Sequence, residues 1–167
     1  VENRHRINQA ANKGVEICAS DDLEAFYPIL LENKAKFDAT PTHTLDELRW
    51  LEQRMPGMMT LFMAYCRGEA IAGELLFAAN RRCVLNFYTM HRYEFHKLHA
   101  VNALIEYALR WSADRGFRFY DYGVSADTFS DNPLEPSWPL VRYKESMGSG
   151  GCLRRAYRWH ASPERVA

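Results

Sequence analysis

Apolar side chains recur at intervals of three and four residues in four segments of the chain, a spacing that gives a helix one buried face. The clearest of these segments is 99–116, where an apolar stripe begins at Val101 and Gly116 is placed to end the helix. Another, 45–55, follows Thr44, whose hydroxyl is suited to cap a helix N-terminus. The sequence therefore predicts helices over 20–37, 45–55, 99–116 and 138–147.

Between the second and third predicted helices the pattern changes to three nearly continuous apolar runs, at 59–67, 70–79 and 83–90. Their connections are of hairpin length, which predicts an antiparallel meander of three strands. The first two runs are apolar on both faces, as expected for strands of a sheet that is covered on both sides. Further strands are predicted at 15–20, 117–123 and 152–160.

The predicted elements follow the order β-α-α-β-β-β-α-β-α-β, which indicates one α/β (α+β) domain over 15–160. The long helix before 117–123 is a connection typical of parallel strands. A mixed central sheet, first antiparallel and then parallel, with helices on both faces, accounts for this order. Residues 1–14 are expected to form a helical lead-in and residues 161–167 a C-terminal tail.

Composition and charge narrow the classes of function. The 21 Lys and Arg residues balance 21 Asp and Glu residues, which argues against a protein that binds nucleic acid through surplus positive charge. The sequence has neither an apolar run of about 18 residues nor a secretory signal at its N-terminus. The chain does not begin with Met, so we expect a processed form or one domain of a longer protein.

The four cysteines are scattered along the chain, and none forms a CxxC pair with another. A zinc site of four cysteines needs closer pairing, and a secreted disulfide framework is denser. We therefore expect free thiols in a reducing compartment and a cytoplasmic location.

Four short motifs resemble those of a known family. "RHRINQAANKGVEI" is similar to an Arg-x-x-Ile-x-x-Ala-x-x-x-Gly-Val segment, and "AYCRGEAIAGELLF" to an Ala-x-x-x-Gly-x-x-x-Ala-Gly strand pair. "RGFRFYDYG" is similar to Gly-x-x-x-Tyr-Asp-Phe-Gly, and "VRYKESMGSGG" to Phe-Lys-x-x-Phe-Gly with Tyr143 and Met147 in the Phe positions. In this order, the motifs and elements resemble the GNAT acyltransferase fold, and within it the FemAB-like transferases and related exopolysaccharide-associated domains.

This resemblance implies an N-acyltransferase, in which an amine attacks an activated carbonyl in a cleft where two central strands part. The acceptor would be a small-molecule, glycan or peptide amine, on a cell-wall or exopolysaccharide precursor in the closest branch. No tightly bound cofactor is implied, since the acyl donor is a co-substrate, either acetyl-CoA or aminoacyl-tRNA with tRNA as the carrier. A homodimer or a preceding GNAT-like domain would complete the assembly.

The start of the central helix bears on the choice of donor. GNAT enzymes that use acetyl-CoA carry Gln/Arg-x-x-Gly-x-Gly there, so that backbone N–H groups and the helix dipole hold the pyrophosphate. The corresponding segment here, "HRYEFHKLHA", contains no glycine. This departure weakens the acetyl-CoA hypothesis and suits a donor such as aminoacyl-tRNA.

The resemblance also implies a set of catalytic residues: Asp121, Lys144 and Tyr143. Lys144 would stabilise the oxyanion or hold a donor phosphate, with a solvated surface lysine as the alternative. Asp121 would accept a proton or orient the amine, with a structural carboxylate bonded to nearby N–H groups as the alternative. Tyr88, Tyr122 and Tyr143 would line the cleft, although a core tyrosine with a satisfied hydroxyl is the favoured interpretation of Tyr88.

The segment "MHRYEFHKLH" is basic, and its side chains are candidates to replace the missing glycines at a donor phosphate. The expected donor-binding residues here are His91, Arg92, His96, Lys97 and His99. Their spacing offers no third metal ligand, so we predict no metal site. The glycines at 148–151 follow a helix rather than precede one, which favours a helix end over a phosphate loop.

Two hypotheses of different classes remain. The first is an N-acyltransferase domain of the GNAT fold. The second is a non-catalytic GNAT-like binding module, or the second half of a larger two-unit transferase.

Overall fold

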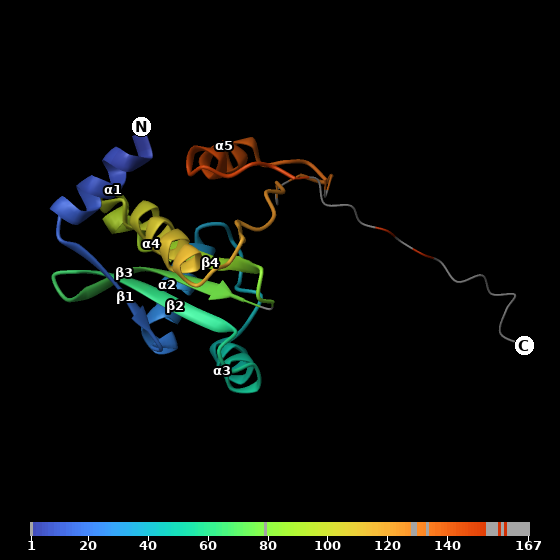
Figure 1. Cartoon of the computed structure of the whole chain (residues 1–167), viewed down its shortest axis with the longest axis horizontal. Helices are drawn as coiled ribbons and strands as arrows, with labels where there is room; N and C mark the ends of the chain where they lie inside the picture. The colour runs from blue at the N-terminus through green and yellow to red at the C-terminus, as the bar shows by residue number, and fades with distance from the viewer. Residues whose placement is uncertain are drawn as a thin grey trace, which may run out of the picture.

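The computed structural model describes residues 2–78, 80–127, 130–132, 134–152, 157 and 159. Figure 1 shows a central sheet with helices on both sides of it. All of the helices and strands belong to this arrangement of helices around one sheet (Figure 1). In chain order they are α1 (Glu2–Asn12), β1 (Val15–Ser20), α2 (Leu23–Ala35), α3 (Leu45–Arg54), β2 (Met59–Cys66), β3 (Glu69–Phe77), β4 (Cys83–His91), the 3-10 helix η1 (Tyr93–Leu98), α4 (Ala100–Asp114), β5 (Phe119–Asp121) and α5 (Trp138–Ser146).

The sheet has the strand order β1-β2-β3-β4-β5. The first four strands are antiparallel to their neighbours, whereas β4 and β5 are parallel and are joined through α4. This is the mixed sheet predicted from the short connections in the meander and the long helical crossover, so the fold class is confirmed.

Helices cover both faces of the sheet. Figure 1 shows α3 on one side of the sheet, and α1, α4 and α5 on the other. On the first face, α2 and α3 pack with Leu75 of β3 in one core cluster; on the second, α4 packs with Leu76 in another. Neighbouring residues of a strand point to opposite faces, which explains why β2 and β3 are apolar at nearly every position.

The feature that positions the site is the point where the pairing of β4 with β5 ends. The register between β3 and β4 shifts at Leu75 and Leu76, because β4 carries one extra residue, Phe87, at that point. Such a bulge bends the strand that contains it. Pairing of β4 with β5 ends where Leu85 meets Asp121, while β4 itself continues to His91. Beyond Leu85, this edge of β4 therefore has no partner strand among the described residues, because β5 ends at Asp121.

The remaining differences from the predicted elements are local. The strand expected over 117–123 is limited to β5, and the helix expected from residue 99 begins at Ala100 after a separate 3-10 helix. The strand predicted over 152–160 lies almost entirely outside the described residues. Cys18 is exposed on the edge strand β1. No helix in the described part of the chain is both long and apolar enough for a membrane crossing.

Candidate active site

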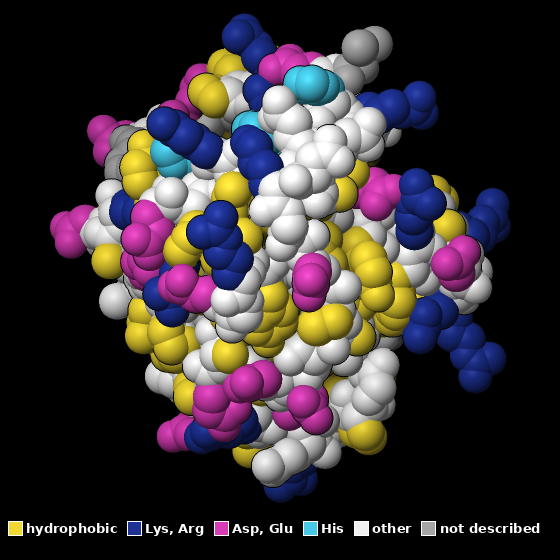
Figure 2. All heavy atoms as spheres, turned by 90° about the vertical axis from the view of Figure 1, so that its left-hand side faces the viewer, with side chains coloured by type: hydrophobic (Ala, Val, Ile, Leu, Met, Phe, Trp, Pro, Cys, Tyr) yellow, Lys and Arg dark blue, Asp and Glu magenta, His cyan; other side chains and the backbone are white. Residues whose placement is uncertain are grey.

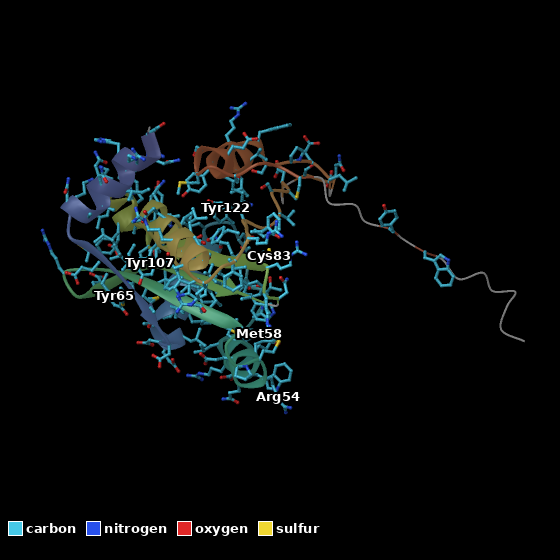
Figure 3. The ribbon with its side chains drawn as sticks, in the orientation of Figure 1. Arg54, Met58, Tyr65, Cys83, Tyr107 and Tyr122 are labelled. Atoms are coloured by element: carbon cyan, nitrogen blue, oxygen red, sulfur yellow. The ribbon has the colours of Figure 1, made fainter. Side chains whose placement is uncertain are left out.

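A cavity of about 330 Å³ opens beside the part of β4 that extends beyond its pairing with β5. The end of β4, the entry into α4, and α5 form most of its wall, and α2 contributes one residue. In Figure 3, Tyr122 lies between the sheet and α5, on this side of the molecule. The residues that line the cavity are Asn33, Thr89, His91, Phe95, His96, Ala100, Val101, Asn102 and Tyr143.

Side chains from α1 and α4 hold α5 in place at the cavity. Asn3 of α1 donates from Nδ2 to the backbone carbonyl of Ser146 at 2.6 Å, which fixes the end of α5. The same residue accepts at Oδ1 from Nδ2 of Asn102 at 3.1 Å. Asn102 is buried in the first turn of α4, where it also lines the cavity. The N-terminal helix α1 is therefore part of the scaffold of the site.

Tyr143 projects from α5 into the cavity wall. Its hydroxyl is buried and has no hydrogen-bond partner among the described residues. Burial, followed by the nearby charges of Glu74 and Tyr122, raises the pKa of Tyr143 above that of a free tyrosine. The hydroxyl is therefore protonated at neutral pH, and its proton is not engaged with any described residue.

Glu74 is a buried carboxyl group in the centre of the sheet that the sequence analysis did not identify. It is 0% exposed, and its Oε1 atom accepts hydrogen bonds from the Tyr120 hydroxyl and from Nδ2 of Asn86 at 2.9 Å. Its Oε2 atom is buried without a partner in the described part of the chain. Burial raises the pKa of Glu74 to about 8, against the opposing effect of the hydrogen bond from Tyr120.

The network of Glu74 reaches the cavity through β4. Asn86 Nδ2 also donates to the Tyr120 hydroxyl at 3.0 Å, and Asn86 Oδ1 accepts from the Thr89 hydroxyl at 2.7 Å. Thr89 lines the cavity and stands directly opposite Glu74 in the β3–β4 register. The carboxyl group thus lies behind the cavity wall rather than at a remote point of the core.

Asp121 and Lys144 both bind the loop that follows β5. Asp121 Oδ1 accepts from the backbone N–H of Gly123 at 2.8 Å. The Lys144 ammonium donates to the carbonyl oxygens of Gly123 and Val124 and to the Ser125 hydroxyl, at 3.1, 2.9 and 2.9 Å. An ammonium has three N–H donors, so all of them are engaged. This geometry agrees with the structural alternative for Asp121, and Lys144 contacts the loop in the same way. Catalytic roles for the two residues stay predictions.

Tyr88 and Tyr122 occupy different surroundings, although both were expected to line the cleft. Tyr88 belongs to the core cluster beneath α2 and α3, and its hydroxyl lies 3.2 Å from Nδ1 of His43. The alternation along β4 that brings Thr89 to the cavity turns Tyr88 to the opposite face, so it is a core tyrosine. Tyr122 packs edge-on against Tyr120 and donates to the Met147 carbonyl at 3.4 Å, with its pKa raised to about 12 chiefly by burial.

The structure divides the basic segment between several environments. His91 and His96 line the cavity, whereas Lys97 lines a second cavity near the β2–β3 turn. Arg92 lies 3.7 Å from the Glu69 carboxylate. His99 takes up a left-handed backbone conformation as the N-cap of α4, with φ of 57°.

The charge of this segment is smaller than the sequence suggests. Burial, and then the charges of Lys36 and His96, lower the pKa of His91, and burial with neighbouring cations lowers that of His99. Both rings are therefore largely neutral at pH 7. A continuous cationic rim does not form from these five residues. Figure 2, which faces the side of the molecule that carries α1, shows positive and negative side chains interspersed.

Within the described residues, no group of three or more His, Cys, Asp or Glu side chains is placed to hold a metal ion. The polar cavity residues that the sequence analysis missed are neutral amides and a hydroxyl, namely Asn33, Asn102 and Thr89. Glu74 did leave a signal, because it is the one charged residue in the apolar run 70–79. Charged side chains are rarely buried without a reason.

Comparison with known proteins places this geometry in a family. A model of the acetyltransferase (GNAT) domain matches residues 2–145. A search of curated protein sequences found no match. The structure of FemX is similar with a TM-score of 0.70 and 14% identity; the similarity covers 89% of this chain and 53% of FemX, so the chain spans about half the length of that protein.

Two smaller enzymes are similar over nearly their whole length. An aminoglycoside acetyltransferase from an uncultured soil metagenomic sample, in complex with sisomicin, has a TM-score of 0.62 and 12% identity, over 90% of this chain and 98% of its own. A ribosomal-protein-alanine N-acetyltransferase from Brucella melitensis biovar Abortus 2308 has a TM-score of 0.59 and 13% identity, over 89% and 100%. These likenesses establish the shared fold, and the family match over residues 2–145 shows that the chain belongs to the GNAT acetyltransferase family.

Proposed function

We propose that this domain transfers an acetyl group from acetyl-CoA to a primary amine, in the cavity between β4, α4 and α5. The observation that supports this most directly is the end of β4–β5 pairing at Leu85 and Asp121, while β4 continues along the cavity to His91. The edge of β4 beyond Leu85 has no partner strand among the described residues. An unpaired strand edge is a template for a ligand with amide groups.

Acetyl-CoA fits this edge because its pantetheine arm carries amides that pair with backbone N–H and C=O groups as an added strand does. The thioester would then lie beside Thr89 and Tyr143 in the cavity wall. The neutral amine attacks the thioester carbonyl, a C–N bond forms, and negative charge develops on the carbonyl oxygen. Backbone N–H groups of β4 stabilise this charge, since they are fixed before the reaction begins.

Two side chains are suited to move protons in this step. His91 lines the cavity and its lowered pKa keeps it neutral, so it can accept a proton from the acceptor ammonium. Tyr143 has a protonated hydroxyl without a partner in the described chain, so it can donate a proton to the leaving thiolate. Asp121 and Lys144 fix the loop 123–125 next to this site and act by positioning it.

A ligand screen tests the choice of donor. Acetyl-CoA, longer acyl-CoAs and aminoacyl-tRNA are added separately, and the melting temperature is followed, because a ligand that binds only the folded state raises it. We expect stabilisation by acetyl-CoA and release of free CoA when an amine is added. Stabilisation by aminoacyl-tRNA alone would mean that aminoacyl-tRNA, and not acetyl-CoA, is the donor. If none of the ligands raises the melting temperature, a non-catalytic binding module is favoured instead.

A pair of variants on α4 ties the screen to the cavity. Val101→Trp places a large side chain in the cavity wall, whereas Arg110→Trp adds the same side chain on the exposed part of the helix. We expect Val101→Trp to weaken acetyl-CoA binding at least about tenfold, which corresponds to about 1.4 kcal/mol, and Arg110→Trp to leave it unchanged. Equal binding by both variants would contradict the proposed location.

A second candidate function rests on the similarity to FemX, of which this chain matches about half. In that case the domain is one unit of a two-unit aminoacyl transferase of the FemAB-like branch, with a cell-wall or exopolysaccharide precursor as acceptor. The missing glycines at the start of α4 also favour a donor other than acetyl-CoA. The aminoacyl-tRNA sample of the screen distinguishes this candidate from the first.

A further inference from the structure

Two buried polar atoms next to the cavity have no hydrogen-bond partner in the described part of the chain. They are Oε2 of Glu74 and the hydroxyl of Tyr143. Buried polar groups in folded proteins are almost always paired, with protein or with an ordered water. A single buried water between the two would satisfy both, and a polar site that offers several partners is where such waters occur.

The fold brings the two residues to the same wall. Thr89 stands directly opposite Glu74 in the sheet, and Thr89 and Tyr143 both line the cavity. The charge of Glu74 also contributes, after burial, to the raised pKa of Tyr143. Tyr143 projects from α5, whereas Glu74 projects from β3, so the pair joins the helical cover to the centre of the sheet.

We propose that Glu74 is the proton reserve of Tyr143: its protonated carboxyl group returns a proton, through a bridging water, to the tyrosine that has protonated the leaving thiolate. Glu74 acts through Tyr143 and is therefore a positioning and supply residue, not one that touches the substrate. This inference rests on the proposed function, because it requires a thioester donor.

The proton transfers balance. The amine nitrogen forms a bond to the carbonyl carbon, the C–S bond breaks, and the sulfur takes the phenolic proton of Tyr143. The bridging water then gives a proton to the tyrosinate and takes one from the Glu74 carboxyl group. The proton that the amine loses is released to solvent, and Glu74 is protonated again from solvent before the next turnover.

The acidities of the groups explain why Tyr143 needs this supply. A thiol has a pKa of about 8.5, whereas burial raises the pKa of Tyr143. Proton transfer from Tyr143 to a thiolate is therefore unfavourable in free energy. Glu74 has a pKa of about 8, close to that of the thiol, so transfer from Glu74 to the thiolate is nearly balanced. Proton transfer is most effective when the acidities match in this way.

The charged and titratable surroundings of Glu74 are few. Tyr120 from β5 and Asn86 from β4 bind its Oε1 atom. Tyr122 and Tyr143 are close enough for the charge of Glu74 to raise their pKa values. Arg6 of α1 is the cation that acts on Tyr143, and it lowers the pKa. Burial therefore dominates the acidity of Glu74.

The test varies the leaving group. Glu74→Gln keeps an acceptor for Tyr120 and Asn86 but cannot supply a proton, and Glu52→Gln on the exposed side of α3 is its control. With acetyl-CoA and an amine, we expect kcat to fall about 10- to 100-fold in Glu74→Gln. With the acetyl thioester of an acidic aromatic thiol, whose thiolate leaves without a proton, we expect nearly wild-type kcat.

A double variant tests whether Glu74 acts through Tyr143. Residues that work as one unit show non-additive losses, so Glu74→Gln combined with Tyr143→Phe should be no slower than Tyr143→Phe alone. Additive losses, or equal losses with both thioesters, would overturn the inference and leave Glu74 a structural residue. A wild-type protein that releases no CoA from any acyl-CoA would instead overturn the proposed function, and this inference with it.

An infrared titration decides the matter if Glu74→Gln does not fold. The wild type should show the C=O band of a protonated carboxyl group at neutral pH, lost with a midpoint near 8, and this midpoint should shift in Tyr143→Phe. Absence of the band at neutral pH, or the same midpoint in Tyr143→Phe, would overturn the inference.

Discussion

Burial is the main cause of the pKa shifts of several side chains in this domain. Glu74 counts as an anion in the composition, yet with a pKa of about 8 it is mostly protonated at pH 7. His91 and Lys144 are shifted in the opposite sense, because burial lowers the pKa of a group that is charged when protonated. Glu74 and His91 therefore carry less charge at pH 7 than the sequence suggests.

The raised pKa of Glu74 predicts a dependence of stability on pH. Its folded-state pKa of about 8 exceeds the value of 4.5 for a free glutamate, so the folded state binds the proton more tightly. The stability gained is complete below pH 4.5 and is lost as pH rises toward and through 8. Between about pH 5 and about pH 8, we expect wild type to lose up to about 1.4 kcal/mol per pH unit relative to Glu74→Gln.

Urea denaturation of both proteins at several pH values measures this difference, and Glu52→Gln, exposed on α3, controls for loss of a carboxylate. A constant difference between wild type and Glu74→Gln across this range would show that Glu74 is ionised in the folded protein at neutral pH.

Lys144 offers a second prediction at this scale. In Lys144→Met the oxygens of Gly123, Val124 and Ser125 lose their common donor, so we expect a loss of about 1–2 kcal/mol in the free energy of unfolding. Arg142→Met, an exposed position on the same helix, should be nearly neutral. A loss of kcat of about 100-fold or more, with stability unchanged, would instead show that Lys144 stabilises the oxyanion, as the sequence analysis predicts.

Among the elements, β3 contributes to the core clusters on both faces of the sheet, and Phe26 of α2 packs against it at Gly73. A Cβ atom at Gly73 would lie 2.5 Å from Cδ2 of Phe26 and 2.9 Å from Sδ of Met63, both in well-packed side chains. Distances below about 3 Å do not occur between such atoms, so a neighbour has to move. The absence of a side chain at Gly73 therefore sets how closely α2 lies on the sheet.

Gly73→Ala should accordingly destabilise the fold by about 1–3 kcal/mol, the usual effect of overpacking a core. Gly150→Ala is the matched control, because a Cβ atom there meets nothing within 4 Å. Chemical denaturation measures both variants, and a neutral Gly73→Ala would mean that α2 adjusts freely.

The hydrophobic pattern predicted the meander and the parallel crossover, because strand length, short connections and helix periodicity are local properties. The extra residue Phe87 could not be predicted in this way, since a bulge is defined by pairing with β3 and not by the β4 sequence. The capping box of α3 depends only on residues that are close in sequence, and Thr44 caps that helix as expected.

At the scale of the whole molecule, the site gathers side chains from α1, α2, β3, β4, α4 and α5. Sequence motifs identified Tyr143, which lines the cavity, but the direction of Lys144, one residue later, depends on how α5 docks. Neutral residues such as Asn33 and Thr89 carry no local sign of function. Only the tertiary arrangement brings them together.

Because the two core clusters lie on opposite faces of the sheet, we expect different substitutions to affect stability and donor binding. Leu48 of α3 is fully buried on the face away from the cavity, so Leu48→Ala should lower the free energy of unfolding by about 2–5 kcal/mol. Acetyl-CoA affinity should stay within about twofold, because distant sites act nearly independently. Val101→Trp in the cavity wall should show the reverse, with affinity lost and stability largely kept. Isothermal titration and urea denaturation measure the two quantities, and a parallel loss of both in Leu48→Ala would show that the sheet couples its faces.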